Sequence, residues 1–293
     1  MKKITILSGK GGVGKSSISA SLAITLSKKY KIITADCDVD ASNLALVLGR
    51  KEKDFEEWDF ISTNQKAVFD LEKCTSCKLC HDECYFKAID WVNNKPKLKP
   101  FSCEGCEVCK MVCPVGAITM EKVNNAKIGY AKTDFGFKVA SAQLEAGESG
   151  SGKLVFEVRR KAESIANDAD FMLIDAAAGV GCPVIASVSG VDFCLLVAEP
   201  TPSGLSDVKR ALEIVKHFKI KAGLIINKFD LNEEYCRKLE EFAKENEIEI
   251  IAKLAYNKIF TKALVEMKPV ILMDDDLKGQ FESIAEKVVE TVG

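Results

Sequence analysis

Short apolar runs with little polar alternation recur along most of the chain. They read KITILS from residue 3, KIITAD from 31, FMLIDAA from 171, DFCLLVAEP from 192 and KAGLIINK from 221. Strands buried on both faces have this pattern, as in parallel sheets covered by helices. Amphipathic stretches lie between them, at residues 15–30, 152–167, 203–218 and 233–245. This order predicts a doubly wound α/β domain with a mostly parallel sheet.

The α/β pattern is interrupted between residues 62 and 123 and resumes afterwards. Eight of the 12 cysteines fall within this segment. Because the pattern resumes, the segment reads as an insertion and not as an appended domain. We therefore expect a discontinuous main domain, residues 1–61 and 124–293, around an inserted domain at 62–123. The stretch IGYAKTDFGFKVASAQL that follows alternates loosely and is compatible with extra strands.

Charge and hydropathy narrow the function classes. The 293 residues include 41 basic and 43 acidic side chains, and no basic run of the kind that binds nucleic acid is present. No apolar run is long enough to span a membrane. We expect a cytoplasmic protein that binds neither nucleic acid nor membrane. In a reducing compartment, so many cysteines favour metal ligation over disulfides.

The cysteine segment is an internal repeat. CTSCKLCHDECYFKAI, from Cys74, aligns with CEGCEVCKMVCPVGAI, from Cys103, and all four cysteines match. Zinc sites usually take two separated Cys-x-x-Cys pairs. Here three cysteines crowd into seven residues, and a fourth follows, which is the run that holds iron–sulfur clusters in bacterial ferredoxins. We predict two [4Fe–4S] clusters, with two zinc ions as the alternative.

The segment closely resembles a bacterial two-cluster ferredoxin, so an α+β ferredoxin-like domain is expected. The resemblance implies that one cluster is held by Cys74, Cys77, Cys80 and Cys113, and the other by Cys84, Cys103, Cys106 and Cys109. The chain departs from the pattern at Tyr85, where proline would follow the cysteine. His81 lies between ligands, where we interpret it as a solvated loop residue.

Residues 9–16 fit the phosphate-loop pattern G-x-x-x-x-G-K-[ST] between an expected strand and an expected helix. Glycines allow backbone N–H groups to surround phosphates, and the helix N-terminus adds positive potential. Lys15 should reach the β- and γ-phosphates, and the Ser16 hydroxyl should ligate Mg²⁺. The expected nucleotide-binding residues are Gly9, Gly11, Gly12, Val13, Gly14, Lys15, Ser16 and Ser17.

A second lysine, Lys10, stands near the start of this loop. KGGVGKS resembles the deviant phosphate loop of the MinD/ParA family, which includes Mrp and the nitrogenase iron protein. The resemblance implies an ATP-bound homodimer in which Lys10 reaches the partner's nucleotide, as an arginine finger does. ADCDVDASNL and FMLIDAAAGVG resemble the family's switches, with Asp38 orienting the attacking water and Asp175 binding Mg²⁺ through water. INKFD resembles the adenine-side motif, with Asn227 contacting the base.

Simpler roles suit several other polar residues. We interpret Asp36 as the end of a strand and Asp40 as a helix cap near Asn43. Asp230 would recognise guanine in a GTPase, but the surrounding pattern favours ATP. GESGSGK, at residues 147–153, matches the first seven positions of a phosphate loop but lacks the Ser/Thr that should follow the lysine. We interpret it as a loop that leads into a helix beginning near Gly152.

The four remaining cysteines divide into two kinds. Cys37, Cys194 and Cys236 lie in or beside apolar runs, where they suit the interior. Cys182 follows the second switch motif, and we interpret it as structural, with metal binding at a dimer interface as the alternative.

Together these features resemble MinD-superfamily ATPases that carry an inserted ferredoxin domain. An ATP-gated electron carrier to a partner metalloprotein is the function we predict. An Mrp-like ATPase for iron–sulfur assembly or insertion is the first alternative, and a MinD-like positioning ATPase is the second. Positioning ranks last because the C-terminal stretch KGQFESIAEKVVETVG has three glutamates against two lysines, and anionic lipid would not attract such a helix.

Overall fold

The computed structural model describes residues 1–293, which divide into two compact units. Unit 1 comprises residues 1–58, 128–143 and 150–293, and unit 2 comprises residues 59–127 and 144–149. The cysteine-rich insertion expected at 62–123 lies within unit 2. Unit 2 also includes a short segment, 144–149, that the sequence pattern did not separate from the main domain.

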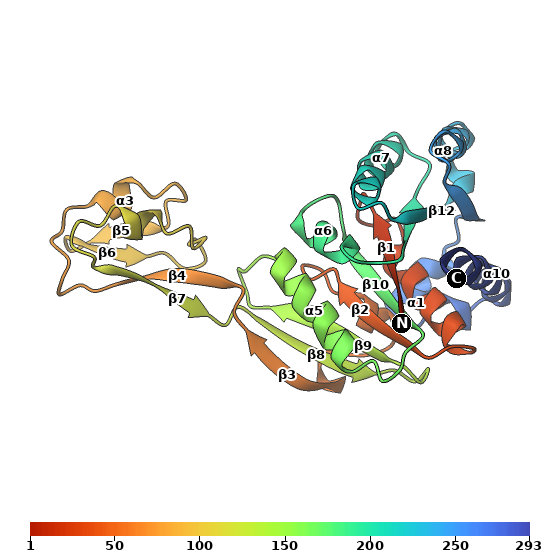
Figure 1. The fold of residues 1–293 in the computed structure, drawn as a ribbon, viewed down its shortest axis with the longest axis horizontal. Helices are drawn as coiled ribbons and strands as arrows, with labels where there is room; N and C mark the ends of the chain where they lie inside the picture. The colour runs from red at the N-terminus through yellow and green to blue at the C-terminus, as the bar shows by residue number, and fades with distance from the viewer. The chain divides into compact units, whose positions relative to one another are not determined.

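A mostly parallel sheet forms the centre of unit 1 (Figure 1). The expected α/β architecture is therefore confirmed. Its nine strands, in spatial order, are β13 (Glu249–Leu254), β12 (Lys221–Asn227), β11 (Phe193–Ala198), β1 (Lys2–Ser8), β10 (Phe171–Ala178), β2 (Ile32–Cys37), β9 (Lys138–Leu144), β8 (Ala126–Lys132) and β3 (Phe55–Ile61). Neighbours from β13 to β9 pair in parallel.

Helices cover both faces of this sheet. In β1, Ile4 and Ile6 belong to the core that includes residues of α1 and α10, whereas the Thr5 hydroxyl donates to Ser187 O of α6. Because alternate side chains of a strand point to opposite faces, α1 and α6 lie on opposite sides. The helices are α1 (Lys15–Ser27), α2 (Leu44–Val47), α5 (Gly152–Ser164), α6 (Cys182–Val188), α7 (Pro202–His217), α8 (Glu233–Glu245), α9 (Ile259–Val265) and α10 (Asp275–Val292), with short 3₁₀ turns η1 (Glu52–Asp54), η2 (Phe229–Leu231) and η3 (Val270–Leu272).

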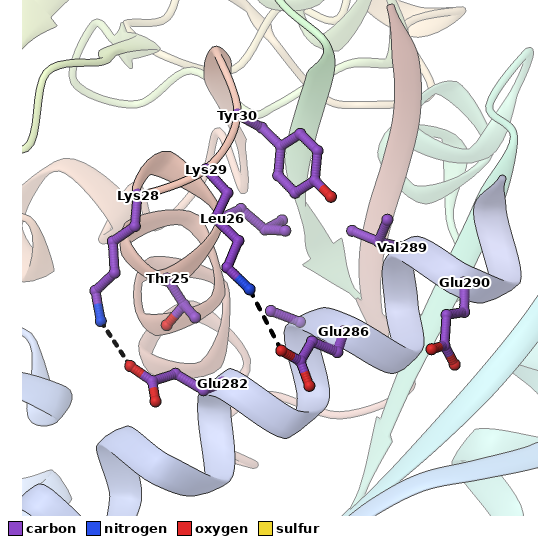
Figure 2. Close-up of a pocket in the computed structure, with 10 residues that line it drawn as sticks. Thr25, Leu26, Lys28, Lys29, Tyr30, Glu282, Glu286, Val289 and Glu290 are labelled. Carbon is purple, nitrogen blue, oxygen red and sulfur yellow. Dashed lines mark hydrogen bonds and ion pairs between the residues drawn. The ribbon is translucent and has the colours of Figure 1, made fainter.

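The first helix differs from the amphipathic stretch expected at residues 15–30. It ends at Ser27, and nearly every side chain from Ile18 to Leu26 is buried, because α10 covers the side that the sheet leaves open. A groove of about 410 Å³ lies between the end of α1 and α10. Ion pairs join the two helices there, Lys28 to Glu282 at 2.8 Å and Lys29 to Glu286 at 3.3 Å (Figure 2).

Unit 2 has the strand pairing of a duplicated motif. Its outer strands, β4 (Asn64–Phe69) and β7 (Ile118–Val123), pair antiparallel, and so do its inner strands, β5 (Ile89–Val92) and β6 (Lys95–Leu98). Each cysteine run leads into a single-turn helix, α3 (Leu79–Asp82) or α4 (Val108–Met111). The order β4-α3-β5-β6-α4-β7 therefore places the two halves in equivalent roles.

No helix in either unit combines the length and apolar character that crossing a membrane requires.

Candidate functional site

The phosphate loop joins β1 to α1 at the carboxyl end of the sheet, where doubly wound folds bind ligands. A Cβ at Gly9 would lie 2.3 Å from the Asp207 carbonyl oxygen, so only glycine fits there. Gly12 and Gly14 have φ of 80° and 94°, values that other residues rarely adopt. No atom lies within 4 Å of a Cβ built on Gly11 or Gly12, so that stretch of backbone is open to a ligand.

Buried charges converge behind this loop. Lys15 Nζ lies 2.8 Å from Asp175 Oδ1 and 3.7 Å from Asp38 Oδ2. Burial alone would lower the pKa of Lys15, but the Asp175 carboxylate raises it overall. Ser19 Oγ also donates to Asp175 Oδ1, at 2.8 Å, whereas the buried Asp175 Oδ2 has no hydrogen-bond partner. The structure thus brings together three of the residues expected at an ATP and Mg²⁺ site, with one carboxylate oxygen left for a further ligand.

Asp36 lies at the end of β2, as expected, and is fully buried beside this cluster. Its Oδ2 accepts from Leu44 N at 3.0 Å. Burial, followed by the neighbouring Asp175 carboxylate, raises the pKa of Asp36 well above its ordinary value. Asp36 therefore supports the loop that carries Asp38 and holds a proton more tightly than a surface carboxyl does.

The interpretation of Asp40 as a helix cap is wrong. The helix α2 begins at Leu44 after Asn43, and no side chain caps it. Asp40 Oδ1 instead accepts from Gly150 N at 2.7 Å. Sequence spacing favoured the nearby helix because the contact with Gly150 joins segments more than a hundred residues apart.

Lys10 does not point into its own phosphate loop but contacts Glu199, which the sequence had not identified. Lys10 Nζ lies 3.3 Å from Glu199 Oε1, and Lys228 Nζ lies 3.0 Å from Glu199 Oε2. Lys228 also donates to Gly12 O at 3.3 Å. Burial would raise the pKa of Glu199, but the two lysines lower it overall. Glu199 lies near the end of the apolar run DFCLLVAEP, but nothing in that run specifies a partner.

Asn227 is the last residue of β12 and packs against the same loop. Its Nδ2 donates to Val13 O at 2.7 Å, and its Oδ1 accepts from Lys228 N at 3.0 Å. A base contact would use its second N–H or its second lone pair. Asp230, three residues on, accepts from Tyr256 N at 2.6 Å.

In unit 2 the eight repeat cysteines line two cavities of equal size. The cysteines of the first are Cys74, Cys77, Cys80 and Cys113, and those of the second are Cys84, Cys103, Cys106 and Cys109. Each cavity thus combines three cysteines of one repeat with one cysteine of the other. Aromatic and apolar side chains complete the walls, among them Trp91 in the first and Phe86 in the second.

Backbone geometry repeats between the two halves at the offset of the sequence repeat. Positive φ occurs at Ser76 and Gly105, at Lys78 and Glu107, and at Lys87 and Gly116. Turns of this kind direct backbone N–H groups into concavities that hold phosphate or iron–sulfur clusters.

The fourth cysteine of each repeat accepts a backbone hydrogen bond. Ala88 N donates to Cys84 Sγ at 3.3 Å, and Ala117 N donates to Cys113 Sγ at 3.2 Å. Hydrogen bonds to ligand sulfurs stabilise the thiolate form and tune cluster potentials. Tyr85, which replaces the expected proline, is 85% exposed and leaves the Cys84 contact intact.

Burial and mutual repulsion act on the cavity thiols. Burial, followed by the Cys103 thiolate, raises the pKa of Cys109 to about 11. Burial also raises the pKa of Cys80, and Cys74, Cys77 and Cys113 add to that effect. Thiols of this kind bind a metal with release of protons. No three His, Cys, Asp or Glu side chains converge on one point as they would around a single metal ion.

Three of the four remaining cysteines are in the interior, as expected. Cys37, Cys194 and Cys236 are buried, whereas Cys182 is exposed at the first position of α6. The false phosphate loop is the start of a helix, because Ser151 caps α5 by accepting from Leu154 N at 3.2 Å.

Comparison with known proteins places this geometry in context. The model of the CobQ/CobB/MinD/ParA nucleotide binding domain matches residues 4–270. An uncharacterized protein of Methanocaldococcus jannaschii is 39% identical over 232 residues, which cover 78% of this chain and 79% of that protein. An iron-sulfur cluster carrier protein of the same organism is 23% identical over 304 residues, covering 99% of this chain and 84% of the relative.

Among solved structures, the septum site-determining protein MinD of Pyrococcus horikoshii, complexed with Mg-ADP, has the same fold. It superposes with a TM-score of 0.63 at 20% identity and covers 100% of this chain and 97% of its own.

Proposed function

Because the chain belongs to the CobQ/CobB/MinD/ParA nucleotide-binding family, we propose that it is a homodimeric ATPase whose nucleotide state gates electron transfer. In this proposal unit 1 binds and hydrolyses ATP with Mg²⁺, and unit 2 holds two [4Fe–4S] clusters. Bound there, the clusters would supply one-electron chemistry between a reduced donor and a partner metalloprotein. The same clusters in isolation would make a simple ferredoxin, so the nucleotide switch is what distinguishes this protein.

The two cysteine cavities carry the proposal. Each has four cysteines, equal volume and ligands from both repeats, and each receives a backbone N–H···S bond at the same repeat position. We assign one cluster to Cys74, Cys77, Cys80 and Cys113, and the other to Cys84, Cys103, Cys106 and Cys109. These ligand sets fit the thiolate-rich, turn-lined environment that cubane clusters require.

Nucleotide binding would rearrange the charges behind the phosphate loop. ATP phosphates compete with Asp175 for Lys15, which now lies 2.8 Å from that carboxylate. The freed Asp175, with its unpartnered Oδ2, would hold Mg²⁺ through water, and Ser16 would ligate the ion directly. Asn227 would contact the base. Binding thereby exchanges an internal ion pair for the bound nucleotide and metal.

Hydrolysis would need one residue from each protomer. Asp38, 3.7 Å from Lys15, would orient the attacking water. Lys10 would leave Glu199 and neutralise charge on the partner's phosphates in the transition state. A monomer would then hydrolyse slowly, because Lys10 is held at Glu199 in its own chain.

The experiment begins with anaerobically purified protein. We expect about eight iron atoms and eight sulfides per chain, as two cubane clusters require, together with ATP hydrolysis that depends on Mg²⁺. Two zinc ions per chain and no visible absorption would contradict the cluster assignment. A midpoint potential that does not change when a non-hydrolysable ATP analogue binds would contradict the gating.

Cluster assembly is the second candidate, because an iron-sulfur cluster carrier protein is similar over 99% of this chain. Two complete four-cysteine sets favour retained clusters over transferable ones. ATP-dependent transfer of iron and sulfide to an apo-ferredoxin, with both potentials insensitive to nucleotide, would favour assembly over electron transfer.

A further inference from the structure

The short part of unit 2 at residues 144–149, here called the return segment, leaves unit 1 after β9 and rejoins it at residue 150. The loop that carries Asp38 holds the chain on both sides of it. Ser42 Oγ donates to Ala142 O at 3.1 Å, just before the return segment. Gly150 N donates to Asp40 Oδ1 at 2.7 Å, just after it.

The contact between Gly150 and Asp40 is closely packed. A Cβ built on Gly150 would lie 2.5 Å from Val39 Cγ2 and 2.8 Å from Asp40 Oδ2. Gly150 is partly buried and Asp40 is exposed, but contacts this close transmit displacement between neighbouring segments.

The return segment is also bound firmly within unit 2. The Glu148 carboxylate, 8% exposed, forms an ion pair with Lys66 of β4. Glu145 N donates to Asn125 O at 3.0 Å. The Glu148 carboxylate is buried and Lys66 is partly exposed, so removal of either partner should be destabilising. Because the ion pair joins the return segment to β4, the two should move together.

The strand β4 in turn contacts one of the two cysteine loops. Gln65, next to Lys66, donates from Nε2 to Glu107 Oε1 at 2.5 Å and to Gly105 O at 3.4 Å. A Cβ on Gly105 would lie 2.5 Å from Gln65 O. Gly105 and Glu107 flank Cys106, so this loop belongs to the second cavity.

We propose that Asp40 is a positioning residue that couples the nucleotide to the cluster of the second cavity. Movement of the Asp38 loop on ATP binding shifts Gly150, the return segment and Lys66 in turn, and changes the environment of Cys106. The inference rests on the proposed function and specifies its regulation. The inference predicts that nucleotide binding shifts the potential of the second cluster more than that of the first. The reason is that the series of contacts ends at the loop that contains Cys106.

A redox titration followed by EPR, with and without a non-hydrolysable ATP analogue and Mg²⁺, tests the inference. Site-to-site coupling is typically about 5- to 150-fold, which is about 40–130 mV at 59 mV per tenfold for one electron. We expect a shift in this range for one cluster of the wild-type protein. Asp40→Ala removes the acceptor and should reduce the shift to less than half, whereas Asp40→Asn keeps an acceptor oxygen and should retain most of it.

A second variant and a control separate the outcomes. Lys66→Ala should also reduce the shift, whereas Lys122→Ala, an exposed lysine on the adjacent β7, should not. Iron content, and affinity for the analogue in the oxidised protein, are measured for every variant and should stay within about twofold of wild type. A wild-type shift that Asp40→Ala and Lys66→Ala both retain would overturn this inference and leave gating intact. No shift in the wild type would overturn gating itself.

Discussion

The functional residues of the two units are supported by cores of different size and composition. In unit 1 the residues around the phosphate loop stand on a large apolar core, and their charges are already paired, Lys15 with Asp175 and Lys10 with Glu199. In unit 2 the buried core consists of Ala67, Cys80, Cys84, Ala88, Ile89, Cys109 and Ile118. Three of these seven residues are proposed cluster ligands, and the other four also line one of the two cavities.

This difference teaches that the two sites depend on their ligands to different degrees. Apolar burial stabilises unit 1 whether or not nucleotide is bound. A small unit with few apolar side chains usually requires metal or disulfides to fold. ATP should therefore adjust a structure that already exists, whereas the clusters should be part of the structure that holds them.

Removal of iron gives the largest expected effect. We expect amides of residues 64–123 to lose protection by about 10³-fold or more, since loss of the clusters removes most of the local stability. Amides of β1, β10 and β11 should keep their protection against hydrogen exchange. Hydrogen exchange measured by mass spectrometry, before and after anaerobic chelation, makes the comparison. Equal protection loss in both units would show that they share one cooperative core.

Lys10→Ala tests the nucleotide unit on its own. The rate of ATP hydrolysis should fall by about 10³-fold or more, as when an arginine finger is lost, with nucleotide affinity nearly unchanged. Asp38→Asn should also abolish hydrolysis and should trap the ATP-bound dimer.

Mixing these two inactive variants shows which chain supplies the lysine. In a symmetric dimer, each mixed dimer would regain one complete site, so an equal mixture should recover about a quarter of the wild-type rate. A mixture that stays inactive would place Lys10 and Asp38 at the same protomer's nucleotide.

A pair of glycines sharpens the comparison within unit 2. Gly105 and Gly116 have similar φ, 67° and 62°, so alanine costs each about 1–2 kcal/mol in backbone strain. Only Gly105 has a neighbour in the way, with Gln65 O 2.5 Å from a built Cβ and nothing within 4 Å at Gly116. Gly105→Ala should destabilise the iron-loaded unit by about 1–3 kcal/mol more than Gly116→Ala, measured by denaturant titration. Equal costs would show that β4 yields easily.

Asp36→Asn gives an effect that depends on pH. The folded-state pKa of Asp36 is raised, first by burial and then by Asp175. The proton's contribution to stability is therefore complete below the unfolded pKa and lost as pH rises through the folded pKa. In that window the stability of the variant relative to wild type should increase by about 1.4 kcal/mol per pH unit. A difference that does not vary with pH would show that Asp36 is not proton-linked to folding.

The sequence predicted most of the fold of unit 1 because its strands are uniformly apolar. Every strand expected from such a run, from KITILS to KAGLIINK, is present within about two residues. It did not predict β3, because FEEWDFI is mixed in character and only partly buried. The C-terminal β13 was missed because EIIAKL at the sheet edge carries charges.

The candidate sites divide along similar lines. Motif residues such as Lys15 and Asp175 are close in space, because the carboxyl ends of adjacent parallel strands meet at one edge. Contacts such as Lys10 with Glu199, and Asp40 with Gly150, depend on how distant segments pack. The local sequence around a single residue that belongs to no motif does not indicate a distant partner. Only the structure therefore shows these contacts.

Chain order in the central sheet has a consequence for synthesis. The strand β1 lies between β10 and β11. Residues 2–8 therefore have no strand to pair with until the chain beyond about residue 171 has left the ribosome. By then all eight repeat cysteines, the last of them Cys113, have emerged. Nascent chains fold as domains emerge, so iron can enter unit 2 while the nucleotide site still lacks Asp175. If unit 2 holds the proposed clusters, a chain without iron would therefore already be misfolded there before it could bind ATP.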